Sequence, residues 1–369
     1  MKQSVPPGLA HLHEELTALA RDGLLRVRPM ARDPDRVSYC SNDYLGLATG
    51  GGPATPAGAG ASRLVSGEHV EHARLEEALA AWVGTETALL FTSGYAANVG
   101  VVPALASHPD DLIVSDALNH ASLVDGCRLA RGQTVVVPHL DVDAVRTALR
   151  ARRARHAWVL TESYFSMDAD SPDLAALREV CDELGAALVV DEAHAFGVLG
   201  PDGRGLLAAA DVKADVTVGT FGKAFGGAGA FVAGCAPLTS WLWNRARSFV
   251  FSTGLSPALA TAAREALETI RSSPELRART AERAAQLRQG LQHLGFAALG
   301  YGHIVPWVLG EANEAVRVAD ALRARGFAVQ SIRPPSVPNG TARIRFTASA
   351  RQRPEDIDAL LDAIRLVTR

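Results

Sequence analysis

The chain has 369 residues, which is enough for one large domain and a smaller one. Its net charge of −3 lacks the basic excess of a nucleic-acid-binding protein, and its hydrophobic share of 48% supports a sizeable core. The early residues include acidic side chains and no apolar signal segment, and glycines and a proline interrupt the uncharged run 224–243, so we expect no membrane span. Four widely separated cysteines without a CxxC pair indicate reduced core thiols in a cytoplasmic protein: Cys40, Cys127, Cys181 and Cys235.

The N-terminal segment, residues 1–47, is predicted to be a helix followed by an extended arm. Apolar residues fall on one face from His11 to Leu25, and Gly23 marks the end of the helix. A short strand that runs into a turn is expected within residues 38–48. Residues 49–61 are nearly all small, which is typical of a loop whose backbone can lie close to another group.

Residues 48–256 alternate short apolar runs with helical segments and therefore predict a large α/β domain. Helices are expected over 71–82 and 174–184, and Gly185 ends the second of them. Short, nearly all-apolar strands are typical of a parallel sheet that is buried on both faces. We predict a mostly parallel seven-stranded sheet covered by helices, with strands at 88–91, 111–115, 134–137, 157–162, 187–192, 215–219 and 229–234.

The pattern changes after residue 256. Two long helices are expected at 257–271 and 275–294, and the first would link the two domains. Strands at 304–310, 327–332 and 342–348 then alternate with helices around 315–322 and 357–364. Residues 257–369 are therefore predicted to contain the linking helix and a small α+β C-terminal domain.

Polar and ionisable residues follow five successive strands of the large domain, at the point where each strand ends. In open α/β sheets, ligands bind outside the carboxyl ends of the strands. Each residue alone also has a common structural explanation, such as a helix N-cap, a structural histidine or a solvated lysine. Together they predict one site, formed by Ser93, Gly94, Tyr95, His120, Glu162, Ser166, Asp191, His194, Thr220 and Lys223.

These residue types fit the chemistry of pyridoxal phosphate. Lys223 is one of only three lysines in an arginine-rich chain, and a desolvated lysine can form a Schiff base with an aldehyde. Asp191, three residues before His194, can keep a pyridine nitrogen protonated, while the histidine can reach a phenolic oxygen. A dinucleotide site would need a GxGxxG motif after the first strand, and the sequence TSGYAAN at that place does not provide it. Asp191 and His194 could also be metal ligands, but the sequence offers no clear third ligand beside them, so we expect no metal.

Ten segments spread over most of the chain make it resemble the α-oxoamine synthases, a branch of the fold-type-I pyridoxal-phosphate enzymes. They are SNDYLGL, SRLVSG, LLFTSGYAAN, SDALNHASLVDG, TESYFSMDAD, VVDEAHAFGVLGPDGRG, TFGKAFGG, FSTGLSPA, IRPPSVP and ARIRFT. SRLVSG, FSTGLSPA and IRPPSVP with ARIRFT favour the family member that condenses L-alanine with a pimeloyl thioester in biotin biosynthesis. In one departure, segment 49–61 is shorter and richer in glycine than the helical segment of the family, so the thioester entrance could differ.

The resemblance implies a role for each residue of the cofactor site. Lys223 would carry pyridoxal phosphate as a Schiff base and act as the general base. Asp191 would pair with the pyridinium nitrogen, and His194 would bond the phenolic oxygen. His120 would stack on the ring and orient the substrate carboxylate, which completes the catalytic set. The other implied cofactor contacts are Glu162 and Ser166 beside the ring, Ser93, Gly94, Tyr95 and Thr220 at the phosphate, and Ser252 and Thr253 at the phosphate of the neighbouring subunit, because family members are homodimers with shared active sites.

The expected reaction is a decarboxylative condensation that releases CO₂ and the free thiol of CoA or an acyl-carrier protein. Its substrate contacts, as the resemblance implies them, are Arg26 (or Arg28), Asn42, His120, Arg333, Ser336 and Arg345. The sequence leaves open other substrate pairs for the same site, namely glycine with acetyl-CoA or serine with a long-chain acyl thioester. An aminotransferase or a decarboxylase on the same fold, and a cofactor-free binding scaffold, are the alternatives from other classes.

Overall fold

The computed structural model describes residues 6, 9–21, 55–334 and 336–368, and these form two compact units. The first unit comprises the described residues up to Ser163 together with Pro172–Thr269. The second unit comprises Tyr164–Ser171 and the chain from Ile270 onward. The strand expected within 38–48 lies outside the described residues, as do Cys40 and three of the substrate-side residues, Arg26, Arg28 and Asn42.

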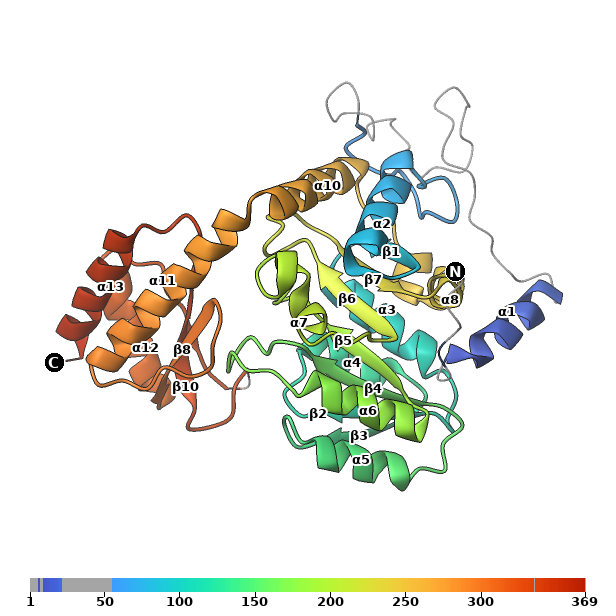
Figure 1. The fold of residues 1–369 in the computed structure, drawn as a ribbon, viewed down its shortest axis with the longest axis horizontal. Coiled ribbons are helices and arrows are strands. Elements are labelled where there is room, and N and C mark those ends of the chain that lie inside the picture. Colours follow the sequence, from blue (N-terminus) through green and yellow to red (C-terminus); the bar gives the residue numbers. More distant parts are fainter. Residues whose placement is uncertain (1–5, 7–8, 22–54, 335, 369) are drawn as a thin grey trace. The chain divides into compact units, whose positions relative to one another are not determined.

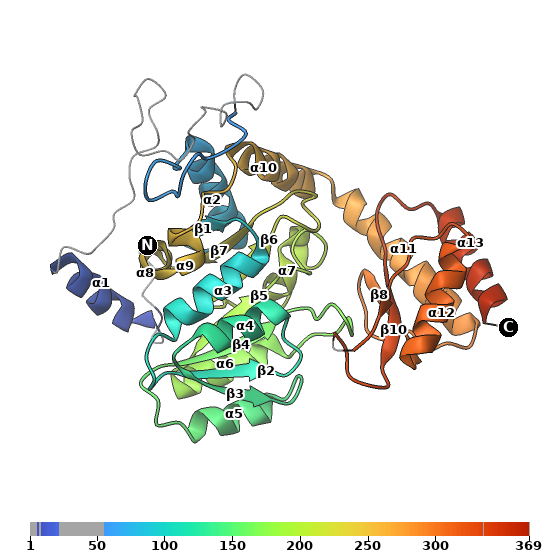
Figure 2. The ribbon, with the colours of Figure 1, turned by 180° about the vertical axis from the view of Figure 1, so that it is seen from behind.

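The first unit contains the predicted seven-stranded sheet, which confirms the expected α/β fold class (Figures 1 and 2). Its strand order is β1-β7-β6-β5-β4-β2-β3. Strand β7 runs antiparallel to both of its neighbours, and the other strand pairs are parallel. Each strand agrees with its predicted range to within one residue: β1 (Thr87–Phe91), β2 (Leu112–Asp116), β3 (Gln133–Val137), β4 (Ala157–Glu162), β5 (Ala187–Asp191), β6 (Val216–Thr220) and β7 (Ala230–Gly234).

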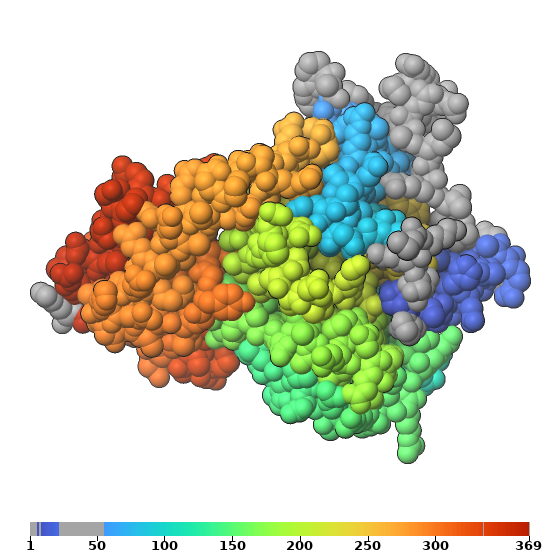
Figure 3. Space-filling model, viewed as in Figure 1, coloured from blue at the N-terminus to red at the C-terminus, as the bar shows by residue number. Residues whose placement is uncertain are grey.

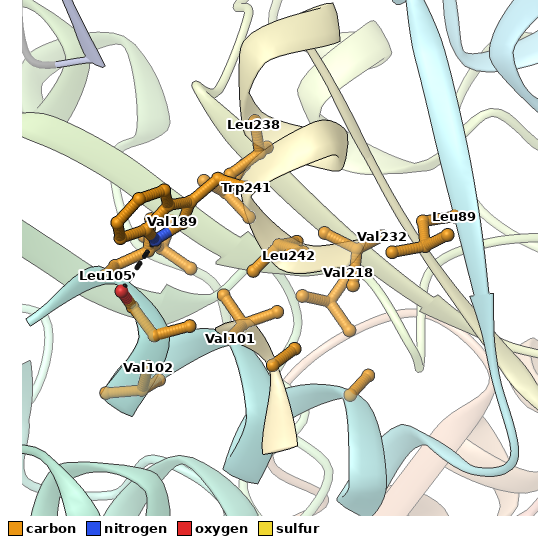
Figure 4. Close-up of a cluster of buried hydrophobic side chains, with 14 of the residues drawn as sticks. Leu89, Val101, Val102, Leu105, Val189, Val218, Val232, Leu238, Trp241 and Leu242 are labelled. Atoms are coloured by element: carbon orange, nitrogen blue, oxygen red, sulfur yellow. Dashed lines mark hydrogen bonds between the residues drawn. The ribbon is translucent and has the colours of Figure 1, made fainter. Parts of the chain in front are cut away.

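Helices bury both faces of this sheet, because successive side chains of a strand point to opposite sides. In β5, Val189 belongs to the apolar cluster shared with α3, α8 and α9, whereas Leu188 and Val190 belong to the cluster shared with α5 and α6. The first cluster also holds three indoles, and that of Trp241 donates from Nε1 to the Ala104 carbonyl at 2.8 Å (Figure 4). The helices of the first unit are α1 (His11–Arg21), α2 (Val70–Val83), α3 (Gly94–Leu105), α4 (Ala121–Leu129), α5 (Val142–Arg150), α6 (Leu174–Leu184), α7 (Gly205–Ala209), α8 (Ala236–Arg245) and α9 (Arg247–Val250), and α10 (Pro257–Ser272) follows them.

Helix ends in the first unit follow the local signals of the sequence. Helix α6 begins after Asp173, whose side chain accepts a hydrogen bond from the Ala176 N–H. It ends at Gly185 as predicted, because this residue adopts a φ of 62° that disfavours residues with a Cβ. Helix α1 begins at His11 as expected, and the predicted end near Gly23 lies beyond the described residues.

The second unit is the expected small α+β structure. Its three-stranded antiparallel sheet has the order β8-β10-β9. Strand β8 (Ile304–Gly310) is an edge strand, a position that tolerates a proline such as Pro306. Helix α11 (Pro274–His293) lies on the surface of this unit (Figure 3). The remaining elements are α12 (Ala312–Arg323), β9 (Ser331–Ile332), β10 (Ala342–Thr347) and α13 (Pro354–Val367).

The strand predicted at 327–332 is wrong except at its end, since only Ser331–Ile332 pairs with β10. Phe327 and Val329 instead pack their side chains against the apolar cluster that contains Trp307. The alternating apolar pattern of this segment therefore reflects side-chain burial without strand pairing.

Hydrogen bonds explain why segment 164–171 belongs to the second unit. Arg343 of β10 donates from Nη1 to the Met167 carbonyl at 2.7 Å and to Asp168 Oδ1 at 2.6 Å. The Tyr301 N–H donates to the Ala169 carbonyl at 2.9 Å. This segment follows β4 in the chain, so the strand end that supplies Glu162 continues directly into the second unit.

Within the described ranges, no helix has the length and apolar character needed to cross a bilayer. The uncharged run 224–243 contains β7 and most of α8. The described part of the chain contains no group of three or more His, Cys, Asp and Glu side chains placed to hold a metal ion. Cys127, Cys181 and Cys235 are free, buried thiols.

Candidate active site

The parallel strands of the first unit bring their carboxyl ends to one edge of the sheet. Glu162 ends β4 and Asp191 ends β5, and the register of this pair places the two residues directly opposite each other. Thr220 ends the next strand, β6. The structure therefore brings the ends of these three strands, with Glu162, Asp191 and Thr220, to one edge of the first unit.

The turn before α3 and the end of β6 form a small cradle. Ser93 is the N-cap of α3, and its Oγ accepts from the Ala96 N–H at 3.0 Å. A Cβ placed on Gly94 would lie 3.6 Å from both Cβ and Oγ1 of Thr220, so the helix start and the strand end are in contact. The N–H groups of a helix N-terminus lack acceptors within the helix and attract anions. Gly94, the backbone of Tyr95 and Thr220 thus have the arrangement needed to hold a phosphate group.

The side chain of Tyr95 does not contribute to this cradle. Its hydroxyl donates to Asp125 Oδ2 at 2.7 Å, and the residue is 49% exposed. This hydrogen bond raises the pKa of the tyrosine. Tyr95 can therefore serve an anion at the cradle through its backbone N–H.

The two buried carboxyl groups at the edge have different surroundings. Asp191 Oδ1 accepts from the Ala193 N–H at 2.8 Å, and Oδ2 accepts from Asn98 Nδ2 at 2.7 Å, so both of its carboxyl oxygens have hydrogen-bond donors. Burial and the nearby Asp191 raise the pKa of Glu162 to about 8, although its Oε1 accepts from the His120 N–H at 2.7 Å. The edge thus holds one carboxyl group with two hydrogen-bond donors and one whose raised pKa favours the protonated form at neutral pH.

The surroundings of His120 favour the neutral form of its imidazole. Loss of hydration lowers its pKa, and the charge of Lys223 lowers it further, against the opposing effect of Asp191. Its Nδ1 lies 2.8 Å from Ser122 Oγ and 3.2 Å from the Ser122 N–H. His194 lies in the turn after β5, half-buried, three residues beyond Asp191.

Lys223 lies in the turn that connects β6 and β7. Two buried rings, Phe221 and Phe225, anchor this turn with centroids 5.4 Å apart, while the lysine side chain is exposed. The charge of Lys223 lowers the pKa of both His120 and Glu162, so its ammonium group acts electrostatically on this edge of the sheet. The exposed lysine is therefore held near the buried carboxyl groups by an apolar anchor.

Sequence reasoning missed two polar residues of the site, Asn98 and Ser122. Asn98 is 1% exposed on α3, and its Nδ2 donates to Asp191 and also to Ser122 Oγ at 2.9 Å. Asn98 lies in the segment LLFTSGYAAN and Ser122 lies in SDALNHASLVDG, but neither segment indicates that the two side chains are in contact. An asparagine in an otherwise apolar helix was the available signal.

A second missed group lies next to the loop that carries Ser252 and Thr253, between α9 and α10. Arg63, 1% exposed, donates to the carboxylates of Glu68 and Glu76, with Nε at 2.7 Å from Glu68 Oε2. We call Arg63, Glu68 and Glu76 the Arg63 cluster. The Gly254 N–H donates to the Ala61 carbonyl at 2.9 Å, so the loop with Ser252 and Thr253 is joined to the segment that carries this cluster.

The other predicted site residues belong to the second unit. Ser166 is buried in segment 164–171. Arg333 and Ser336 are exposed, and the Ser336 N–H donates to the Arg333 carbonyl at 3.0 Å. Arg345 on β10 is half-buried, and loss of hydration lowers its pKa. The neighbouring Arg343 is the buried arginine that binds Asp168, so its role is structural.

The residues of the first unit fit pyridoxal phosphate. Asp191 presents a buried carboxylate for a pyridinium nitrogen, and Gly94 with Thr220 leaves a backbone cradle for a phosphate. Lys223 supplies an amine whose charge acts on both His120 and Glu162. This donor set contains each group that the cofactor requires.

Comparison with known proteins supports this assignment. The family model "Aminotransferase class I and II" matches residues 34–364. The chain is 47% identical over 348 residues to 8-amino-7-oxononanoate synthase of Anaeromyxobacter dehalogenans (strain 2CP-1), covering 90% of this chain and 86% of the relative. It is 45% identical over 376 residues to the enzyme of the same name from Geobacter sulfurreducens, covering 95% and 96%.

A solved structure of serine palmitoyltransferase from S. paucimobilis, with a bound PLP–myriocin aldimine, superposes with a TM-score of 0.83 at 26% identity. The match covers 100% of this chain and 99% of that one. The family match, the long alignments and this fold agree with the strand-end site. The chain therefore belongs to the aminotransferase class I and II family, within the α-oxoamine synthase branch of the fold-type-I pyridoxal-phosphate enzymes.

Proposed function

We propose that the chain condenses L-alanine with a pimeloyl thioester to give 8-amino-7-oxononanoate, CO₂ and a free thiol, a step of biotin biosynthesis. The observation that carries this proposal is the 45–47% identity to proteins of that name over at least nine tenths of the chain. The strand-end site supplies the chemistry that this reaction needs.

Pyridoxal phosphate, when bound, supplies an electron sink for the pair of electrons left when a bond to the amino-acid α-carbon breaks. Lys223 would hold its aldehyde carbon, and Asp191 would hold a proton on its pyridine nitrogen. Gly94, the Tyr95 backbone and Thr220 would bind its phosphate, assisted by Ser93. His194 would reach its phenolic oxygen, and Ser166 would lie beside it.

The chain's own groups then perform the proton transfers and the positioning. The Lys223 amine accepts the α-proton of L-alanine as general base. The Asp191 carboxylate is buried, so its interaction with a protonated pyridine nitrogen would take place at low dielectric, where a pair of opposite charges attracts most strongly. The neutral His120 orients the substrate carboxylate and donates a hydrogen bond to the acyl oxygen. Glu162, protonated at neutral pH, adds no second negative charge next to Asp191.

The substrate side and the assembly extend this proposal. Arg333, Ser336 and Arg345, together with Arg26 and Asn42, are assigned to the substrate carboxylates on the family resemblance. Ser252 and Thr253 would reach the cofactor phosphate of a partner subunit in a homodimer. The three described cysteines are buried thiols, which suits a reaction in the cytoplasm.

Substrate profiling tests the proposal. The purified chain, loaded with pyridoxal phosphate, is given L-alanine, glycine or L-serine, each with pimeloyl-CoA, acetyl-CoA or palmitoyl-CoA. Thiol release and product mass are measured, and pimeloyl-acyl-carrier protein is compared with pimeloyl-CoA. The highest kcat/KM is expected for L-alanine with a pimeloyl thioester.

Preference for L-serine with palmitoyl-CoA would contradict the proposed substrates and match the activity named for the structural relative. A keto-acid product without thiol release would contradict the condensation and indicate an aminotransferase.

A further inference from the structure

Asn98 occupies a position between two functional groups of the first unit. It lies on α3, while Asp191 ends β5 and Ser122 lies in the first turn of α4. Its side chain is buried, and Nδ2 is 2.7 Å from Asp191 Oδ2 and 2.9 Å from Ser122 Oγ. One amide group thus contacts both the carboxylate of the proposed cofactor site and the residue that bonds His120.

The direction of these hydrogen bonds follows from the chemistry of the groups. A carboxylate only accepts, so the Asn98 atom that faces Asp191 must be the NH₂ nitrogen and not the carbonyl oxygen. The two hydrogens of this nitrogen go to Asp191 and to Ser122 Oγ. Asn98 Oδ1 has no hydrogen-bond partner in the described part of the chain, and an unpaired buried acceptor costs free energy. The donors, not the acceptor, account for an asparagine at this position.

The direction of the next hydrogen bond, from Ser122 to His120, follows in the same way. Because Ser122 Oγ accepts from Asn98, its own hydrogen is available for His120 Nδ1 at 2.8 Å. The backbone N–H of Ser122 also points at Nδ1, at 3.2 Å, and a backbone N–H can only donate. Nδ1 must therefore be unprotonated, and the ring proton of neutral His120 lies on Nε2.

We propose that Asn98 is a positioning residue that fixes the Asp191 carboxylate with one N–H and, through the Ser122 hydroxyl, the Nε2-protonated tautomer of His120 with the other. This inference rests on the proposed function of Asp191 and His120. The Nε2–H is then a hydrogen-bond donor, which is what an oxygen acceptor on the substrate requires. The loss of hydration that keeps His120 neutral supports the same state.

The two branches of this arrangement predict different results for two variants. Ser122→Ala removes the hydroxyl donor to His120 and leaves the bond between Asn98 and Asp191. Asn98→Ala removes both branches. Asn244→Ala is a matched control, because Asn244 is also buried in the first unit and its Nδ2 donates to the Ser240 carbonyl of its own helix.

The tautomer is read directly from long-range ¹H–¹⁵N spectra of the full chain, labelled with ¹⁵N-histidine and loaded with pyridoxal phosphate. The His120 signals are assigned by their loss in His120→Phe. In the wild type we expect a protonated Nε2 and an unprotonated Nδ1. In Ser122→Ala only the longer contact from the backbone N–H, at 3.2 Å, still favours an unprotonated Nδ1, and in Asn98→Ala the Ser122 hydroxyl is free to accept from Nδ1. Both variants should therefore show a larger fraction of the Nδ1-protonated tautomer, and Asn244→Ala should leave the wild-type pattern.

Cofactor binding separates the branches. The dissociation constant of pyridoxal phosphate should rise about tenfold or more in Asn98→Ala, as is typical when an outer partner of a binding group is lost. In Ser122→Ala it should stay near the wild-type value, while kcat/KM for L-alanine falls roughly 10–100-fold. Asn98→Leu, which has a similar branched shape and no hydrogen-bond donor, serves if Asn98→Ala does not fold.

A wild-type His120 protonated on Nδ1, or an unchanged tautomer in Ser122→Ala, would overturn the inference. So would wild-type cofactor affinity in both Asn98 variants. The tautomer and the affinity are measured without L-alanine or thioester. A wild type that passes both measurements but makes no 8-amino-7-oxononanoate would refute the proposed substrates and leave the inference standing.

Discussion

The strand-end edge of the large sheet and the Arg63 cluster both concentrate charged side chains, but these charges are paired differently. In the Arg63 cluster, three almost fully buried groups satisfy one another, and the guanidinium also lies over Trp243 and Phe249 at 5.2 and 5.6 Å. At the strand-end edge, buried carboxyl groups lie near an exposed lysine, and burial raises the pKa of Glu162 to about 8.

This difference shows that charge density alone does not identify a catalytic site. A buried cluster in which every charged group is hydrogen-bonded to an opposite charge is a structural element, since none of its charges is accessible. Incompletely compensated groups whose pKa values are shifted beside an accessible amine are typical of catalytic sites. The comparison predicts that substitutions at the edge change activity, whereas substitutions in the Arg63 cluster change stability.

The largest effect is expected for Lys223→Ala. Loss of the general base should lower kcat by at least about 10²–10⁴-fold, and the free energy of unfolding should change by less than about 0.5 kcal/mol because the side chain is exposed. Condensation kinetics and urea denaturation measure the two quantities. Lys213→Ala, another exposed lysine of the first unit, is the control and should retain wild-type turnover. Substantial turnover in Lys223→Ala would contradict the assignment of this residue.

The next effect is on stability. Arg63→Met leaves Glu68 and Glu76 buried without their cation, so the free energy of unfolding should fall by about 3–5 kcal/mol. Adding Glu68→Gln and Glu76→Gln should restore part of this loss.

The exposed pair Arg353–Asp356 provides the control for Arg63, and Arg353→Met should cost no more than about 1 kcal/mol. Urea denaturation compares the variants. Equal losses for Arg63→Met and Arg353→Met would remove the distinction between the two regions.

Glu162→Gln should change how stability depends on pH. The folded-state pKa of Glu162 is about 8, above its ordinary value of 4.5, so the folded chain binds the proton more tightly than the unfolded chain. Wild-type stability from this group is therefore present below pH 4.5 and is lost as pH rises through 8. The variant does not lose this stability as pH rises. Its free energy of unfolding relative to the wild type should therefore increase by up to a few kcal/mol between about pH 5 and pH 8.

Urea denaturation at three pH values, without added cofactor, measures this difference for Glu162. Glu192, whose pKa burial raises to about 7, is common to both proteins and cancels. A difference that is independent of pH would show that Glu162 is not held in its protonated form.

The smallest effect is expected for Tyr95→Phe. The lost hydroxyl bonds the half-buried Asp125, and the phosphate cradle uses the backbone of Tyr95. The dissociation constant of pyridoxal phosphate should stay within about twofold, and stability within about 0.5 kcal/mol. Fluorescence titration measures the affinity. A tenfold weaker affinity would place the Tyr95 hydroxyl in the site.

Most of the large sheet could be predicted from sequence, because strands buried on both faces leave continuous apolar runs such as 157–162. The segment 327–332 could not, since Phe327 and Val329 bury their side chains without strand pairing. The strand-end residues were found because the rule for open sheets places them at one edge. The bond between Asn98 and Asp191 joins residues 93 positions apart, and no local pattern encodes it.

One measurement tests the central claim, that the strand-end edge is a pyridoxal-phosphate site held by Lys223. The chain is loaded with the cofactor, reduced with borohydride to make the link permanent, digested and analysed by mass spectrometry. The three lysines, Lys2, Lys213 and Lys223, are far enough apart to fall on separate peptides. The account predicts a stoichiometric phosphopyridoxyl group on the Lys223 peptide. A label on Lys213 or Lys2 in its place, or no label, would contradict it.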